Sequence, residues 1–302
     1  PLSTESSVFG KPLKLRYYQS NAVNRAFSAI LEGKKKMLLA LATGTGKTQI
    51  AFQIARKFWN ETDQQGNHPK ILFLTDRTKL LTQAMDGDFK PFGDARHRLQ
   101  GKKQTQYDMY FTLYQSLGVD KTNEVTEEDS QLYKLYPKDF FQMVIIDECH
   151  RGGAKDESRW RGIMEYFSSA VQIGLTATPK RKFNADTYAY FGEPVYIYSL
   201  KEGIKDGFLT PFKVKRIQTT MDEYVYTGDD DVLAGEDEIV EGEVFEEQDF
   251  NRRIIIEERE KKRVQLMLDS INPKEKTLVF CANIAHAGMV RDLINQVSVN
   301  PS

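Results

Sequence analysis

The 302-residue chain is poor in cysteine. Its two cysteines, Cys149 and Cys281, each stand beside an apolar run, and neither has a C-x-x-C companion. Two isolated thiols exclude a disulfide framework and argue against a zinc site, since such sites need closely spaced ligand pairs. Both side chains are therefore expected to be buried free cysteines.

Long apolar segments are also absent. No run approaches the roughly eighteen apolar residues that a membrane-spanning helix requires, and the mean hydropathy is negative. The N-terminal residues Pro1 to Thr4 do not begin a charged leader with an apolar core. Neither a membrane span nor a secretion signal is predicted, so we expect a cytoplasmic protein.

Positive charge is missing from one stretch. Residues 217–251 contain thirteen acidic side chains and no Lys or Arg, although the whole chain has a net charge of only −1. Residues 1–116 hold 18 Lys and Arg against 9 Asp and Glu. A polyanionic partner would be attracted to the first part and repelled by the acidic stretch. The alternative, that both are solvated faces without a partner, stays open.

Apolar runs and helical patterns alternate along the chain, which predicts an α/β fold with a parallel sheet. Runs typical of buried strands occur at 37–41, 71–75, 109–113, 140–146, 171–175 and 195–198. Helical spacing is present at 18–32, in the segment after Lys47, and at 160–167. Residues 86–106 are rich in Gly, Lys and Arg and predict a basic loop, and 118–139 predict an inserted surface loop.

The length allows about two domains of ordinary size. We expect a lead-in at 1–14, a first domain at 15–205, and a connector, acidic segment and incomplete second domain at 206–302. In this last part the patterns predict strands at 212–217 and 277–281 and helices at 252–271 and 284–297.

The stretch from Ala42 to Thr48, A-T-G-T-G-K-T, lies between a strand pattern and a helix pattern. Glycine permits the positive φ that turns backbone N–H groups toward phosphate oxygens, and the following helix adds the positive end of its dipole. Lys47 would contact the β- and γ-phosphates and Thr48 would ligate Mg²⁺. The predicted nucleotide-binding residues are Thr43, Gly44, Thr45, Gly46, Lys47 and Thr48.

A partner motif follows one hundred residues later, where the apolar run 143–146 delivers Asp147 and Glu148 to a strand tip. Asp147 is expected to hold Mg²⁺ opposite Thr48, and Glu148 to orient and deprotonate the attacking water. Lys47, Asp147 and Glu148 are the predicted catalytic residues. Together the two motifs predict an ATP site with Mg²⁺, because paired carboxylates are tolerable beside a dication.

Other polar residues stand at strand tips, where ligands of open α/β sheets bind. They are Asp76, Arg77 and Thr78 after one strand, Gln115 and Ser116 after the next, and Thr176 and Thr178 after a later one. The hydroxyls of Thr176 and Thr178 could bond a phosphate or a neighbouring domain, and a plain turn closed by Pro179 is the alternative. Gln19 has an amide able to pair with adenine.

These motifs in this order resemble the superfamily 2 helicases and translocases. The runs Asp147 to Gly152, Gly174 to Pro179, Tyr190 to Gly192, Tyr198 to Leu200 and Asp206 to Leu209 are similar to the motor region of type I restriction endonuclease R subunits. The resemblance covers nearly the whole chain. One departure is Leu41, where the general phosphate-loop pattern has glycine. Helicase-type loops often lack that first glycine.

The resemblance implies a RecA-like P-loop domain followed by part of a second one. It implies that Gln19 reads adenine and that His150, Thr176 and Thr178 couple nucleotide state to domain movement. It also implies duplex DNA as a partner, together with the specificity and modification subunits of a type I complex. The implied contacts to the DNA backbone are Arg77, Thr78, Gln115 and Ser116.

Such motors take one or more arginines from later motifs of the second domain, and these are not found in the chain. An arginine finger is worth roughly 10³ to 10⁵ in turnover, so the 302 residues alone are expected to bind ATP and Mg²⁺ but to hydrolyse ATP slowly. The acid and lysine cluster of an R-subunit nuclease is not found either. Two alternatives stay open: a stand-alone superfamily 2 repair helicase, and a non-catalytic nucleotide-gated DNA-binding module.

Overall fold

The computed structural model divides into two compact units, Pro1–Pro211 and Phe212–Ser302. It describes residues 7–8, 11–12, 14–100, 103–114, 116, 132–149, 154–177, 187–216, 223–225, 233–234, 244–246, 249–251, 253–272 and 274–299. Within this part of the chain, no helix has the length and apolarity to cross a membrane.

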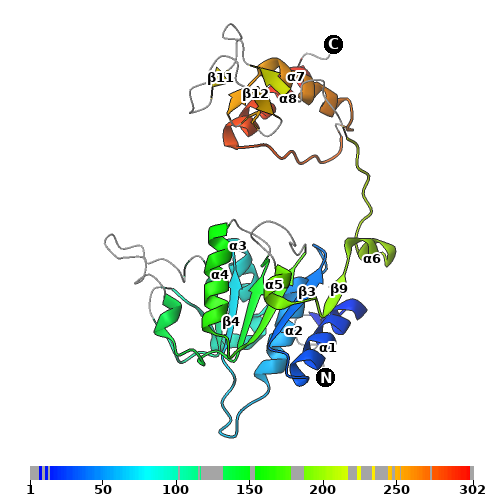
Figure 1. The fold of residues 1–302 in the computed structure, drawn as a ribbon. Helices are drawn as coiled ribbons and strands as arrows, with labels where there is room; N and C mark the ends of the chain where they lie inside the picture. Colours follow the sequence, from blue (N-terminus) through cyan, green and yellow to red (C-terminus); the bar gives the residue numbers. More distant parts are fainter. Residues whose placement is uncertain are drawn as a thin grey trace, which may run out of the picture. The chain divides into compact units, whose positions relative to one another are not determined.

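The first unit is built on a seven-stranded sheet among the described residues, in the order β5-β6-β4-β7-β8-β3-β9 (Figure 1). Every neighbouring pair of strands runs parallel. The strands are β3 Lys36–Leu41, β4 Ile71–Thr75, β5 Arg96–Arg98, β6 Met109–Leu113, β7 Met143–Asp147, β8 Val171–Thr176 and β9 Tyr196–Tyr198. The predicted parallel sheet with flanking helices, of the RecA-like kind, is confirmed.

Side chains of the central strands alternate between two buried clusters, as the pleat of a strand requires. In β4, Ile71 and Phe73 enter one cluster, whereas Leu72 and Leu74 enter the other. Because both faces are covered, the strands read as continuous apolar runs. This explains why they could be recognised from the sequence.

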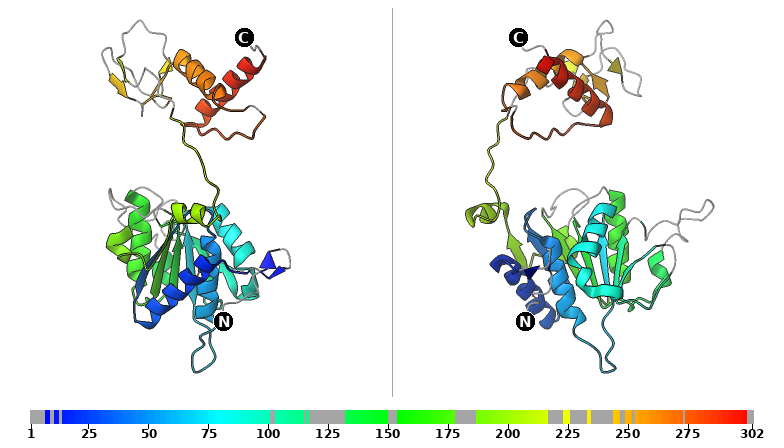
Figure 2. Two further views of the ribbon diagram at one scale, coloured as in Figure 1. Left: turned by 90° about the vertical axis from the view of Figure 1, so that its right-hand side faces the viewer. Right: turned by 180° about the vertical axis from the view of Figure 1, so that it is seen from behind.

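Helices cover the two faces separately (Figure 2). The cluster on one face includes residues of α1 Tyr17–Leu31, α2 Lys47–Trp59, α3 Thr78–Gln83 and the turns η1 Ala84–Asp88 and η2 Lys90–Ala95. The cluster on the other includes residues of α4 Ala154–Tyr166, α5 Thr187–Phe191 and the turn η3 Leu132–Leu135. The helix α6 Leu200–Lys205 follows β9, and the short strands β1 Ser7–Val8 and β2 Lys11–Pro12 pair near the N-terminus.

The prediction of a basic loop at 86–106 was wrong. This segment contains η2 and the edge strand β5, which pairs in parallel with β6. Phe89 and Phe92 are buried there, and both stack edge-on against Phe52 of α2. The many charged residues around these two aromatic anchors concealed them, because neither an apolar run nor a clear alternation was present.

The second unit contains two short antiparallel pairs and two helices among its described residues. The pairs join β10 Glu223–Val225 to β12 Val244–Glu246 and β11 Leu233–Ala234 to β13 Ile254–Ile255. The helices are α7 Glu257–Leu268 and α8 Ile284–Val299, and Val264, Val290 and Leu293 pack them together. The predicted helix 284–297 is confirmed, whereas the predicted helix 252–271 is shorter and follows β13.

The strands predicted at 212–217 and 277–281 are wrong within the described residues. Residues 212–216 and 277–281 form no ladder, and the side chains of Leu278 and Phe280 are 77% and 89% exposed. A buried strand needs neighbours that pair its N–H and C=O groups, and the described part of this unit places no parallel strand beside either run. The apolar pattern alone could not supply that partner.

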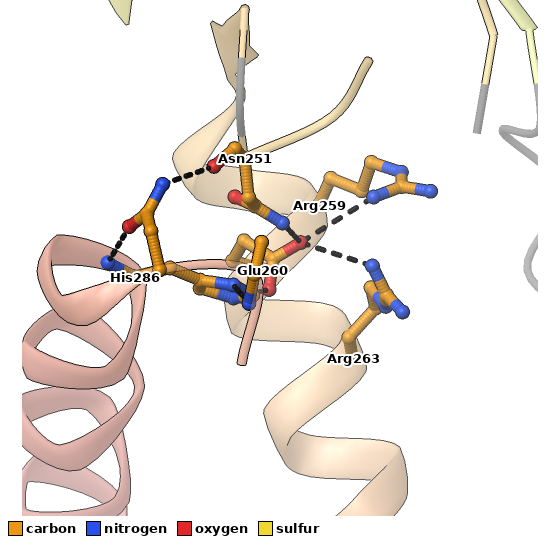
Figure 3. A network of polar contacts seen from close by, with 7 residues as sticks. Asn251, Arg259, Glu260, Arg263 and His286 are labelled. Atoms are coloured by element: carbon orange, nitrogen blue, oxygen red, sulfur yellow. Dashed lines mark hydrogen bonds and ion pairs between the residues drawn. The ribbon is translucent and has the colours of Figure 1, made fainter. Parts of the chain in front are cut away.

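A buried carboxylate joins α7 to α8 (Figure 3). Glu260 accepts hydrogen bonds from Asn251 Nδ2 at 2.8 Å and lies 3.0 Å from His286 Nε2. The guanidinium groups of Arg259 and Arg263 lie within 3.4 Å of the same carboxylate. Burial acts to raise the pKa of Glu260, but Asn251, His286 and Arg263 outweigh it and hold this pKa below its usual value.

Candidate nucleotide site

The sheet order brings the two predicted motifs together. Strands β7, β8 and β3 are consecutive neighbours, so the segments that follow β7 and β3 leave the same carboxyl edge with only β8 between them. Asp147 is the last residue of β7, and the phosphate loop begins directly after β3. Lys47 and Asp147, one hundred residues apart in the sequence, therefore lie at the same sheet edge with one strand between them.

The loop from Ala42 to Gly46 is held by its own hydrogen bonds and by α1. Thr45 Oγ1 donates to the carbonyl of Ala42 at 2.6 Å. The carbonyl of Thr45 accepts from Gln19 Nε2 at 2.9 Å and from the Tyr18 hydroxyl at 3.1 Å. These hydrogen bonds fix the conformation of the loop from within the protein, and such preorganisation lowers the entropy cost of binding.

Gly44 and Gly46 adopt φ values of +83° and +79°, in the left-handed region that glycine tolerates. A Cβ on Gly46 would also lie only 2.6 Å from Gln19 Nε2. Helix α2 begins at Lys47, so its free N–H groups face the loop. Positive φ, free N–H groups and lack of side chains are the features that a phosphate cradle requires.

The three predicted catalytic side chains meet at this edge. Lys47 Nζ lies 3.3 Å from Glu148 Oε1, and the two side chains are only 7% and 12% exposed. The backbone N–H of Glu148 donates to Asp147 Oδ1 at 2.9 Å. Glu148 itself has φ of +54°, which is costly for a residue with a side chain and is typical of functional sites.

Asp147 lies in an environment that disfavours its charge. Burial, followed by the negative charge of Glu148, raises the pKa of Asp147 to about 6, although Lys47 and the Glu148 N–H act in the opposite direction. A cation bound beside Asp147 would relieve both effects. The donor set fits Mg²⁺, which prefers carboxylate and hydroxyl oxygen.

The glycine loop and the buried Lys47 fit a triphosphate, and the hydroxyl of Thr48 and the carboxylate of Asp147 would hold the metal. When bound, Mg²⁺ neutralises charge on the phosphate oxygens. Lys47 supplies a second positive charge from the start of α2. Glu148, which lies beside Lys47, would then be available to orient a water and accept its proton.

A model of the family described as "Type III restriction enzyme, res subunit" matches residues 12–181, which include all of these groups. The chain belongs to this family.

Two endonuclease subunits of type I restriction enzymes are similar to this chain. The EcoAI endonuclease subunit of Escherichia coli is 41% identical over 290 residues, covering 95% of this chain and 34% of the relative. The EcoKI endonuclease subunit of Escherichia coli is 32% identical, covering 92% of this chain and 26% of the relative. This chain thus spans about a third or less of each. The resemblance to type I R subunits predicted from the motifs is confirmed.

A solved structure agrees. A fragment of a putative HsdR subunit of a type I restriction enzyme from Vibrio vulnificus is 37% identical with a TM-score of 0.65, covering 94% of this chain and 45% of the solved chain. The likeness therefore extends from the sequence of this restriction-enzyme family to its fold.

Gln19 was predicted to read adenine, and the structure shows it in another role as well. Its amide N–H holds the Thr45 carbonyl, and its carbonyl accepts the backbone N–H of Arg16 at 2.9 Å. Each half of the amide keeps one further hydrogen-bonding position. Adenine recognition stays a prediction. Thr43 is exposed beside the loop, and Thr48 is half-buried in the first turn of α2.

The residues implied to contact DNA lie after β4 and β6, which are neighbours in the sheet. Arg77 precedes α3 with 64% of its side chain exposed, Thr78 is the first residue of α3, and Ser116 is exposed. Gln115 lies outside the described residues. These positions are on the same edge as the nucleotide site, and their role in DNA binding stays a prediction.

Of the residues implied to couple nucleotide to movement, Thr176 is fully buried at the end of β8. His150 and Thr178 lie outside the described residues. The sheet register pairs Asp147 with Leu175, so Thr176 follows directly after the neighbour of the carboxylate that is predicted to bind Mg²⁺. Its coupling role stays a prediction.

Sequence reasoning gave no role to Tyr18, whose hydroxyl holds the Thr45 carbonyl. The ring of Tyr18 stacks on Tyr198 at 4.1 Å between centroids, so β9 supports the phosphate loop through α1. A tyrosine at an apolar helical position is ordinarily part of the core, and only its place next to Gln19 could have drawn attention. Asp76 was predicted only to lie, with Arg77 and Thr78, at a strand tip where a ligand could bind.

Proposed function

We propose that this chain is the motor region of a type I restriction endonuclease subunit, which hydrolyses ATP with Mg²⁺ to translocate along duplex DNA. The observation that carries the proposal is the meeting of Lys47, Asp147 and Glu148 at one sheet edge beside a preformed glycine loop. The identity to EcoAI and EcoKI subunits supports the restriction assignment.

The roles follow from the contacts. In this structure Lys47 neutralises Glu148 across 3.3 Å. A triphosphate would compete for the ammonium group, because its oxygens carry more charge than one carboxylate. Glu148 would then be released as a base next to the γ-phosphate. ATP binding thereby prepares the carboxylate that later activates the water.

Duplex DNA, the specificity and modification subunits, and a cytoplasmic location belong to the same proposal. The excess of Lys and Arg in residues 1–116 would attract phosphates without reading sequence, so sequence recognition would come from the other subunits. Fast hydrolysis also needs an arginine from a complete second motor domain. The isolated chain is accordingly expected to bind Mg·ATP and to turn it over slowly.

Glu148→Gln in the full-length protein tests the proposal. The variant should keep affinity for ATP within about threefold and lose DNA-stimulated turnover by about 10² to 10⁴. Triplex displacement on duplex DNA should be lost with it. Unchanged turnover in the variant would leave only a nucleotide-gated binding module, and strand separation by the wild type would favour a repair helicase. The isolated chain, run in the same assay, should hydrolyse ATP far more slowly than the full-length protein.

A further inference from the structure

Asp76 is a third carboxylate at the nucleotide edge. It follows β4, whose neighbour in the sheet is β7, and the register pairs Leu74 with Ile146. Asp76 and Glu148 each follow directly after the last residue of these neighbouring strands, at the same carboxyl edge. The side chain of Asp76 is only 9% exposed, so it does not extend into solvent as a strand-tip aspartate usually does.

The two oxygens of Asp76 have different surroundings. Oδ2 lies 3.3 Å from Arg77 Nε. Oδ1 is buried and has no hydrogen-bond partner among the described residues, and the same is true of the neighbouring Thr75 Oγ1. A buried carboxylate oxygen without a donor is destabilising, and such groups in native proteins call for a partner such as water or an ion.

The charge balance of the edge points to the identity of that partner. Among the described residues, Asp76, Asp147 and Glu148 bring three negative charges to this edge. Lys47 and Arg77 bring two positive charges within reach of them, which leaves an excess of one negative charge. The negative charge of Asp76 contributes to the raised pKa of Asp147, so the two carboxylates interact across the gap between their strands. A hydrated divalent cation would satisfy both the excess charge and the missing donor.

We propose that Asp76 is a positioning residue that connects the Mg²⁺ end of the nucleotide site to Arg77. Its Oδ1 accepts a hydrogen bond from a water that accompanies the bound metal, while its Oδ2 holds the guanidinium of Arg77. The proposal rests on the proposed function, because it requires Mg·ATP at this edge and DNA at Arg77.

Arg77 is suited to be the other end of the connection. Its side chain is 64% exposed although its partner is almost buried, so the guanidinium lies at the surface and is tethered from beneath. Without Asp76 the arginine would sample many rotamers and lose its preorganisation. With the metal-bound water drawn to Oδ1, the carboxylate is fixed, and the arginine is fixed with it.

The test uses the full-length protein and Asp76→Asn, with Asp86→Asn as the matched control because Asp86 is exposed on η1, ten residues further along the chain. Mn²⁺ replaces Mg²⁺ so that its binding with a non-hydrolysable ATP analogue can be followed by electron paramagnetic resonance. Asp76→Asn should weaken Mn²⁺ binding about tenfold, as loss of an outer hydrogen-bond partner of a metal does, and Asp86→Asn should not.

The second readout is the affinity for duplex DNA, measured by fluorescence anisotropy with and without the Mg·analogue at one salt concentration. In the wild type, the DNA affinities with and without the Mg·analogue should differ by about fivefold or more. In Asp76→Asn the ratio of these two affinities should be close to one. Arg77→Gln leaves the buried carboxylate in place and tests the same connection from the solvent side. It should lose the ratio while keeping Mn²⁺ affinity within about twofold.

The proposal is overturned if Asp76→Asn binds Mn²⁺ as tightly as Asp86→Asn, or if Arg77→Gln keeps the wild-type ratio. The Arg77→Gln result tests the proposal even if Asp76→Asn does not fold. Failure of the proposed function is distinguishable, since a wild-type protein that binds no Mg·nucleotide at all would overturn that function. If the wild type shows DNA-stimulated turnover and Asp76→Asn matches the wild type in Mn²⁺ affinity and in the DNA-affinity ratio, only the role of Asp76 is overturned.

Discussion

At the scale of single residues, the site combines two features that disfavour folding. Asp147 is 6% exposed and has Glu148 as its neighbour, and Glu148 has a left-handed backbone conformation. Both features lower the free energy of unfolding. A sequence selected for stability alone would have other residues at these two positions. Two predictions follow from the chemistry of individual positions.

The first concerns Asp147→Asn. The pKa of Asp147 in the folded protein, about 6, lies above the ordinary value of 3.8 for an aspartate, so the folded state binds the proton more tightly than the unfolded state. The free energy of unfolding therefore falls as pH rises between about 4 and about 6, and the penalty is complete at pH 7. Removing the charge should stabilise the nucleotide-free protein by about 1–3 kcal/mol at neutral pH.

Urea unfolding at several pH values from about 4 to about 8 measures this effect. The exposed Asp139→Asn is the control and should leave stability within about 0.5 kcal/mol. Mg·ATP binding should be weakened in Asp147→Asn alone. A variant that is less stable than wild type at pH 7 would show that Asp147 is structurally favourable in its charged form.

The second prediction concerns Gly46→Ala compared with Gly66→Ala. Both glycines have φ near +80°, so alanine is strained at each by about 1–2 kcal/mol. Only at Gly46 would the new Cβ meet an atom, Gln19 Nε2 at 2.6 Å, whereas nothing lies within 4 Å at Gly66. Gly46→Ala should therefore also displace Gln19 and lower ATP affinity about tenfold or more, equivalent to 1.4 kcal/mol.

A fluorescent ATP analogue titrated against both variants measures the difference. Gly66→Ala should bind it within about twofold of wild type, since the altered turn lies away from the loop residues. Equal losses in the two variants would mean that backbone strain, and not the contact with Gln19, determines the shape of the loop.

At the scale of elements, the position of the strands at the carboxyl edge depends on the close packing of a helix against the sheet. Gly174 lies in β8, between the strands that carry the two motifs, and Phe191 of α5 packs directly on it. A Cβ at Gly174 would lie 2.9 Å from two ring atoms of Phe191 and 3.1 Å from Leu38 Cδ1. The glycine thus lets α5 lie against the centre of the sheet.

Gly174→Ala should destabilise the protein by about 1–3 kcal/mol, because the extra methyl group overpacks the core. The control is Gly162→Ala in α4, where the nearest atom to a new Cβ is Tyr133 Oη at 3.6 Å. That change should stabilise by about 0.5–1 kcal/mol, since alanine favours a helix over glycine. Chemical denaturation of both variants gives the two values, and the same sign for both would contradict the packing argument.

At the scale of the whole molecule, the two units differ in charge. Residues 1–211 hold 30 Lys and Arg against 24 Asp and Glu, and the remainder holds 12 against 19. The large buried clusters of the sheet lie wholly in the first unit, and the second has small clusters of its own. The first unit is therefore expected to fold when expressed alone.

A fragment of residues 1–211 should bind duplex DNA more tightly than the 302-residue chain at low salt, because the acidic remainder repels phosphates. The difference should shrink between about 50 mM and about 300 mM salt as charges are screened. Anisotropy titrations of both proteins measure this difference in DNA affinity. A thermal unfolding experiment should first show that residues 1–211 unfold at the same temperature in both proteins. Tighter binding by the longer chain would place DNA contacts in the second unit.

The sequence by itself determined the parts of the site whose chemistry is local. Three features could be predicted because they depend only on residues nearby in the chain. They are the glycines that need positive φ, Lys47 at the start of a helix, and the carboxylates at the end of an apolar run. The strands buried on both faces were readable for a similar reason. The strands predicted at 212–217 and 277–281 failed because a strand depends on a partner that its own pattern does not contain.

Tertiary structure decided which of these pieces meet. Only the order β7-β8-β3 brings Asp147 and Glu148 to Lys47, and only the pairing of β4 with β7 brings Asp76 to the same edge. The support that Tyr18 and Gln19 give to the phosphate loop also comes from packing of α1, not from spacing. Contacts between residues far apart in the chain depend on strand order, which local periodicity leaves open, and the charge state of Asp147 depends on those contacts.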